Sequence, residues 1–140
     1  MKPEFLLTVH GYQHYENQTP DMVELTTEAE LTAEGGVLYL RYNETELTGL
    51  LGTVTTFEIH PHRVVLRRTG TLESQMEFMV GKTHQSLYDM GQGALLVTVQ
   101  TTEIDDRMGL NGGTLRVCYN ITIEDLGSGR VVYALEVRRK

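Results

Sequence analysis

The sequence is short of cysteine, tryptophan, proline and long hydrophobic runs: its 140 residues include one Cys, no Trp and three Pro. The single Cys118 cannot form a disulfide within the chain, which excludes a disulfide-stapled secreted scaffold and a thiolate-rich zinc site. The apolar stretch Phe5–Val9 is too short for the core of a signal peptide, and no run approaches the roughly 18 apolar residues of a membrane-spanning helix. We therefore expect a soluble cytoplasmic protein without a membrane partner.

Basic residues are also scarce, with 12 Lys and Arg against 19 Asp and Glu, for a net charge of −7. The imbalance is local, because residues 1–46 contain nine acids and two bases whereas residues 47–140 contain ten of each. An acidic surface repels phosphate backbones, so we expect no nucleic-acid partner. We interpret the terminal bases Arg138, Arg139 and Lys140 as a solvated tail.

What the sequence does contain is apolar residues at every second position. In Met22–Leu31, Val23 and Leu25 share one face while Glu24 and Glu28 share the other, as in a strand with one wet face. Similar or less clear alternation predicts about nine strands, which are Phe5–Tyr12, Met22–Leu31, Val37–Tyr42, Thr53–Ile59, Val64–Arg68, Leu72–Val80, Leu95–Thr101, Leu115–Ile123 and Val131–Val137.

Short turns separate the predicted strands. Glycine-rich links such as Glu34–Gly36, Asn111–Gly113 and Gly127–Gly129 are typical of tight hairpins. Lys82–Gly93 shows no clear alternation, and we interpret it as a short irregular strand or a loop. Strands joined by tight turns favour an antiparallel meander, and closure removes its exposed edges. The sequence therefore predicts one all-β domain over residues 1–140, an up-and-down barrel of about eight or nine strands.

Several short motifs point to a known family. In chain order they are Tyr39-Leu40-Arg41-Tyr42-Asn43-Glu44, Gly52, Arg68-Thr69-Gly70, Phe78, Gly81, Tyr88, Gly93 and Tyr119. Their order and spacing, over roughly Val37 to Val137, resemble the bacterial YwiB-like family. The resemblance implies a calycin-like barrel, similar to the lipocalin and streptavidin-like folds, and a biochemical role that is unassigned.

The missing tryptophan separates this chain from the better-understood calycins. Lipocalins usually carry Gly-x-Trp on their first strand, and biotin-binding barrels line their pocket with several Trp. The chain has no Trp. Neither a true lipocalin nor a biotin binder is therefore supported.

Arg68 is the first candidate site residue. If Val64 and Leu66 point inward, Arg68 also points inward near the end of its strand. A buried guanidinium must form an ion pair or be hydrated. Glu44 is the expected ion-pair partner, with Glu46 as second choice. Two interpretations stay open: an ion pair that plugs the barrel end, or an anchor for a ligand carboxylate or phosphate.

Large side chains are available to shape a barrel interior, and most of them are expected to form core. Those we expect to line a ligand cavity together with Arg68 and Glu44 are Tyr39, Tyr42, Phe78, Tyr88 and Tyr119. Whether such a barrel is filled by its side chains or holds one small ligand is not decided by the sequence.

Catalytic and metal sites find little support. His10 and His14 would lie roughly 13 Å apart on a strand, too far to share one ion, and His60 and His62 flank Pro61 in what we interpret as a solvated turn. Ser128 sits in a plain hairpin link rather than in a nucleophile elbow. We therefore expect no catalytic residues, no metal and no cofactor.

The leading hypothesis is non-catalytic binding of a small anionic or amphipathic molecule inside the barrel, with Arg68 as its anchor. The hypothesis rests on analogy of fold and on an inward arginine. The alternative is a protein–protein interaction module, whose acidic strand face of Glu24, Glu28 and Glu30 docks a basic partner. A monomer and a homodimer are both compatible with the sequence.

Overall fold

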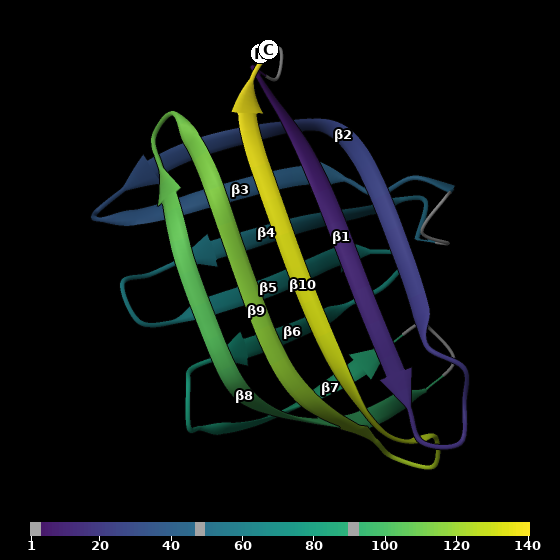
Figure 1. Ribbon diagram of the computed structural model, residues 1–140. Coiled ribbons are helices and arrows are strands. Elements are labelled where there is room, and N and C mark those ends of the chain that lie inside the picture. The colour runs from purple at the N-terminus through teal and green to yellow at the C-terminus, as the bar shows by residue number, and fades with distance from the viewer. Residues whose placement is uncertain (1–3, 47–49, 90–92) are drawn as a thin grey trace.

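The computed structural model describes residues 4–46, 50–89 and 93–140. The described chain forms ten antiparallel strands (Figure 1). Their bounds are β1 (Phe5–Tyr15), β2 (Asp21–Glu34), β3 (Val37–Asn43), β4 (Thr53–Ile59), β5 (Val64–Gly70), β6 (Ser74–Phe78), β7 (Thr83–Asp89), β8 (Ala94–Gly109), β9 (Gly112–Ile123) and β10 (Gly127–Arg139).

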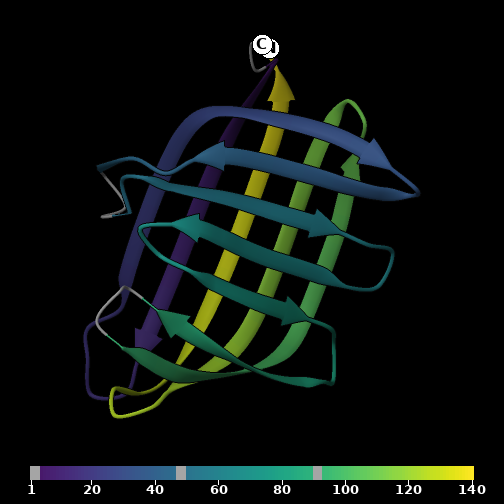
Figure 2. The same cartoon turned by 180° about the vertical axis from the view of Figure 1, so that it is seen from behind.

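The strands form a nearly closed barrel. They lie in the order β6-β5-β4-β3-β2-β1-β10-β9-β8-β7. In this order β1 pairs with β10, and each of the remaining ladders joins two strands that follow one another in the chain. The two ends of this order meet at a bridge between Glu73 and Asp89. In Figure 1, β1, β8, β9 and β10 run steeply on the near wall and β3 to β6 cross behind them, and in Figure 2, seen from behind, β3 to β6 form the near wall. The long strand β2 bends from one wall to the other.

The alternation of the sequence places the apolar residues inside. On β4, Thr53, Thr55, Phe57 and Ile59 are buried while the residues between them are partly exposed. One region of the interior is filled by side chains and is called here the packed region. Its members include Phe5, Leu7, Leu40, Phe57, Leu66, Leu115, Val117, Leu135 and Val137, all buried.

The predicted architecture is confirmed, but the strand number is corrected from about eight or nine to ten. The additional strand is β7, within the stretch Lys82–Gly93 that showed no clear alternation. On β7 the half-buried positions are His84, Ser86 and Tyr88, and the exposed positions include Leu87. Because β7 half-buries polar residues and exposes an apolar one, an alternation of apolar and polar residues could not predict this strand.

Candidate ligand-binding cavity

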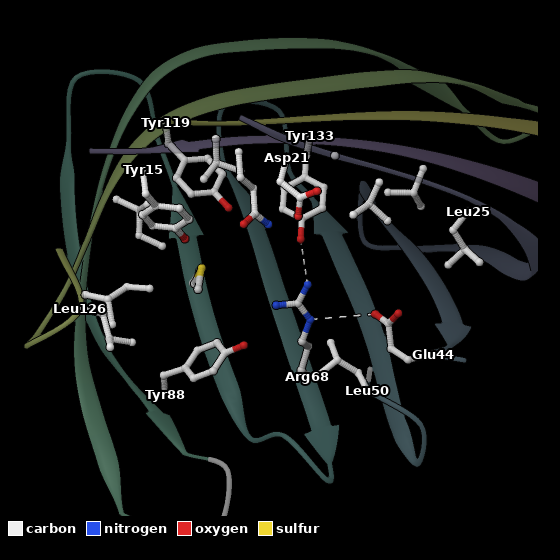
Figure 3. Close-up of a pocket in the computed structure, with 18 of the residues that line it drawn as sticks. Tyr15, Asp21, Leu25, Glu44, Leu50, Arg68, Tyr88, Tyr119, Leu126 and Tyr133 are labelled. Carbon is white, nitrogen blue, oxygen red and sulfur yellow. Dashed lines mark hydrogen bonds and ion pairs between the residues drawn. The ribbon is translucent and has the colours of Figure 1, made fainter. Parts of the chain in front are cut away.

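The rest of the barrel interior is hollow. A cavity of about 580 Å³ is lined chiefly by strands from both walls (Figure 3), and the exposed residues of its lining are Asp21, Val23 and Leu126. Its volume is that of a typical small-molecule pocket. The residues lining it, called here the hollow region, are Val9, Gly11, Gln13, Tyr15, Asp21, Val23, Leu25, Tyr42, Glu44, Leu50, Arg68, Met76, Tyr88, Leu95, Tyr119, Ile121, Ile123, Leu126, Val131 and Tyr133.

Arg68 projects into the cavity from the end of β5. Val64, Leu66 and Arg68 alternate on the inner face of this strand, and all three are buried. Gly70 follows with a φ of 118°, and a Cβ there would lie 2.1 Å from the carbonyl oxygen of Gly52. Glycine therefore lets β5 approach the start of β4 closely, which helps to set the position of the arginine.

The guanidinium of Arg68 is only partly paired. Its Nη2 donates a hydrogen bond to the Tyr133 hydroxyl at 3.1 Å. Its Nε lies 4.0 Å from Oε2 of Glu44, which is close enough for charge attraction and too long for a hydrogen bond. Within the part of the chain that the structure describes, Nε is buried without any hydrogen-bond partner. Arg68 itself is only 8% exposed, so this unmet donor is unusual.

Glu44 balances the charge of Arg68 from the end of β3. Its backbone N–H donates to the carbonyl of Thr53 at 2.9 Å, which holds the residue against β4. Its Oε2 accepts a hydrogen bond from the Thr55 hydroxyl at 2.5 Å, and Tyr42 also donates to its carboxylate. The Glu44 side chain is therefore held by polar partners beside the arginine rather than left free in the cavity.

Tyr15, Tyr88, Tyr119 and Tyr133 line the cavity, and their hydroxyl groups face the same space as the guanidinium (Figure 3). Tyr133 accepts the hydrogen bond from Arg68, whereas the other three hydroxyls have no hydrogen-bond partner among the described residues. Buried phenols usually find such a partner. Tyr15 and Tyr88 are only half-buried, and the three hydroxyls are open to water or to a molecule bound in the cavity.

Burial controls the protonation of these groups. It raises the pKa of Tyr119 well above the ordinary phenol value, with Tyr133 as a second cause, and it raises the pKa of Tyr15 and Tyr88 as well. Burial acts to lower the pKa of Arg68, but Tyr133, Tyr42 and Glu44 outweigh it and the net shift is upward. At neutral pH the phenols are therefore neutral and the guanidinium is charged.

The structure brings together five of the seven predicted site residues. Arg68, Glu44, Tyr42, Tyr88 and Tyr119 all line the cavity.

The remaining two predicted residues do not line the cavity. Phe78 is buried behind the cavity wall, with its ring centroid 4.7 Å from that of Tyr119, so it supports a lining residue. Tyr39 lies between Leu38 and Leu40 on β3, so its side chain is on the opposite face of the strand from Leu40 and Tyr42.

Two tyrosines of the cavity were not predicted as site residues. Tyr133 shares the inner face of β10 with Val131 and Leu135, so its inward direction was readable from the alternation. Tyr15 lies beyond the predicted end of the first strand at Tyr12, and β1 continues to Tyr15 in the structure. Extending the alternation of Val9 would have placed Tyr15 inside.

The acidic strand face is partly neutralised within the chain. Glu24 lies 3.6 Å from His10, and Glu28 forms an ion pair with Lys140. Lys140, predicted as part of a solvated tail, thus adds a positive charge to the acidic strand face. The Glu28–Lys140 pair lowers the charge that Glu28 could offer to a basic partner.

The lone cysteine and the histidines lie outside the cavity. Cys118 is buried on the outer side of β9, and its Sγ lies 3.7 Å from Oε2 of Glu103. Burial raises the pKa of the Cys118 thiol, with Glu103 as a further cause. Across residues 4–46, 50–89 and 93–140, no group of three or more His, Cys, Asp and Glu is placed to hold a metal ion.

Comparison with protein families gives one clear match. The model of the family described as "Domain of unknown function (DUF1934)" matches residues 7–135, nearly the whole chain. The chain belongs to this family.

Solved structures show the same fold. The crystal structure of the ywiB protein from Bacillus subtilis superposes with a TM-score of 0.88, and the match covers 99% of this chain and 93% of that one at 16% identity. The predicted YwiB-like family and barrel are thereby confirmed. A search of curated proteins finds no match. In the described residues, no helix is long and apolar enough to cross a membrane.

Proposed function

We propose that this protein is a non-catalytic binding protein that holds one small amphipathic molecule in the hollow region of its barrel. The observation that carries the proposal is the guanidinium of Arg68, a buried residue whose side chain projects into a cavity of ligand size and whose Nη1 has no hydrogen-bond partner among the described residues. A purely structural ion pair would be expected to satisfy its donors, because unmet buried donors destabilise the fold.

The lining suits an amphipathic guest. Arg68, Glu44 and the tyrosine hydroxyls form a polar cluster, whereas most of the other lining residues are apolar. A few placed polar groups in a mostly apolar pocket are typical of small-molecule sites. The cluster would orient the guest, and the apolar wall would supply its binding energy.

The chemistry of the cluster supports binding rather than catalysis. General acids and bases work best when their pKa is near the working pH. Burial raises the pKa of Tyr15, Tyr88 and Tyr119, and the pKa of Arg68 is also raised. These groups therefore keep their protons at neutral pH, so they hold a guest and exchange no proton with it.

The test is to fill the cavity at Gly11. This residue lines the cavity, and a Cβ built on it meets its nearest atoms, in Tyr133 and Val23, at 4.0 Å. A larger side chain can therefore enter the cavity from β1 without a backbone clash. N-phenyl-1-naphthylamine, a neutral dye that fluoresces in apolar surroundings, serves as the probe.

We expect the dye to bind the wild type and Gly11→Ala, and to bind Gly11→Leu at least tenfold more weakly. Gly11→Ala is the matched control because it removes the same glycine and fills little space. Absence of dye binding to the wild type, or equal binding to Gly11→Leu with the barrel folded by circular dichroism, would contradict the proposal.

A further inference from the structure

The charges and hydrogen-bonding groups of the cavity indicate the class of its guest. We infer that the site takes an uncharged molecule with a carbonyl group, such as an amide, at its polar end and an apolar body; this inference rests on the proposed function. The sequence suggested an anionic or amphipathic guest, and this inference retains the amphipathic guest without the negative charge.

The first reason is the charge already present in the cavity. Among the described lining residues, the charged side chains are Arg68, Glu44 and Asp21. Arg68 and Glu44 are buried 4.0 Å apart and balance each other, while Asp21 is exposed. The two buried charges of the cavity therefore compensate each other, and the third charge belongs to an exposed residue.

A charged guest would be unfavourable in this setting. An anion held by Arg68 would lie beside Glu44, and a cation held by Glu44 would lie beside Arg68. In either case a third charge would be buried next to a pair that already compensates itself, and unpaired buried charges strongly destabilise a complex. An uncharged guest avoids this penalty.

The second reason is the kind of hydrogen bond that the cavity offers. The third guanidinium nitrogen of Arg68, Nη1, points toward the open space on the side of Tyr88 and has no marked partner (Figure 3). A guanidinium can only donate, so it requires an acceptor such as a carbonyl oxygen. The hydroxyls of Tyr15, Tyr88 and Tyr119 can both donate and accept, so they suit the N–H and C=O groups of an amide.

The third reason is the shape of the remaining space. The polar groups gather around Arg68, while Leu25 and Leu126 lie along other parts of the wall (Figure 3). An apolar body would contact these side chains while the carbonyl group faces the guanidinium. Burial of that body contributes roughly 25 cal/mol for each Å² of apolar surface.

The experiment compares three eight-carbon probes that differ in charge: octanamide, octanoate and octylammonium, titrated into the wild-type protein by calorimetry at neutral pH. We expect octanamide to bind at least tenfold more tightly than either charged probe. Equal or tighter binding of octanoate or octylammonium would overturn the inference and leave the proposed function intact. If the neutral dye binds but none of the three probes does, the inference also fails alone, whereas failure of the dye contradicts the proposed function.

Hydroxyl deletions test whether the carbonyl group lies beside Arg68. Tyr88→Phe and Tyr119→Phe keep the aromatic ring and remove one cavity-facing hydroxyl each. We expect each to weaken octanamide binding roughly fivefold, the effect of one hydrogen bond, and to leave dye binding unchanged. Tyr39→Phe, on the outer face of β3, is the matched control and should change neither. Unchanged octanamide binding in both cavity variants would overturn the inference.

Discussion

The packed and hollow regions of this barrel are built from the same strands but from different kinds of side chain. On β5, Leu66 belongs to the packed region and Arg68, two residues later, to the hollow one. On β1, Leu7 fills the interior whereas Gly11 leaves it open. A change of side chain every second residue, with no change of backbone, thus converts a hydrophobic core into a cavity.

The comparison also shows where the fold is stabilised. Tight packing in the first region gives the stability that a small domain needs. The second region contains a buried ion pair and hydroxyls without partners, which contribute less or destabilise.

The largest effect is expected from truncation in the packed region. Leu66→Ala removes a fully buried side chain and should lower the free energy of unfolding by about 3 kcal/mol, because it leaves a new void. Urea denaturation measures the change. Leu25→Ala, which only enlarges the existing cavity, is the matched control and should lose about half as much. Equal losses would contradict the division into two regions.

The next effect concerns the buried ion pair. Arg68→Met leaves the Glu44 carboxylate without its cation and should destabilise the protein by about 2–3 kcal/mol. The double variant Arg68→Met/Glu44→Gln removes both charges and should regain most of that loss. Thermal unfolding of the two variants measures the difference. If the double variant is no more stable than the single one, the pair is not a charge-compensating unit.

A third effect is confined to alkaline pH. The pKa of Tyr119 is raised in the folded state, so its stabilising contribution is complete below the unfolded value of about 10 and is lost as the pH rises above it. The free energy of unfolding should therefore fall above pH 10, by at most about 1.4 kcal/mol per pH unit for this tyrosine. Denaturation of Tyr119→Phe should show a shallower fall, whereas a slope like that of the wild type would contradict the prediction.

The smallest expected effect is an increase in the free energy of unfolding. Gly11→Ala should stabilise the protein by about 0.4–1 kcal/mol, since Gly11 does not have a positive φ and the cavity has room for a methyl group. Ala29→Val makes a comparable addition in the core, where Ala29 is 1% exposed, and should instead destabilise by about 1 kcal/mol. Paired thermal melts measure both signs. If both variants changed the melting temperature in the same direction, the two regions would be equally tightly packed.

Much of this fold was predictable from the sequence because most strands bury an apolar face. The alternation of Val64, Leu66 and Arg68 pointed the arginine inward, and Glu44 was the expected partner. The same parity would have placed Tyr39 outside, opposite Leu40 and Tyr42, had it been applied to that residue.

Other features could not be predicted from the pattern. β7 turns polar residues toward the interior, so its hydrophobicity carries no period-two signal. The cavity is harder to predict than β7, because its volume depends on the combined sizes of side chains from several strands. Gly11 is an example: in the sequence it is a small residue in a strand, and only the assembled barrel shows the room beside it.

The pairing of β1 with β10 has a kinetic consequence. It joins Phe5 to Arg139, whereas the other ladders join strands that follow one another in the chain. Hairpins between such neighbours can form early, but the β1–β10 ladder requires the closure of a very long loop and is expected to be slow. The cavity has no complete wall until then. In stopped-flow refolding, we therefore expect dye fluorescence to rise after the circular dichroism signal of the strands, and simultaneous changes would contradict this order.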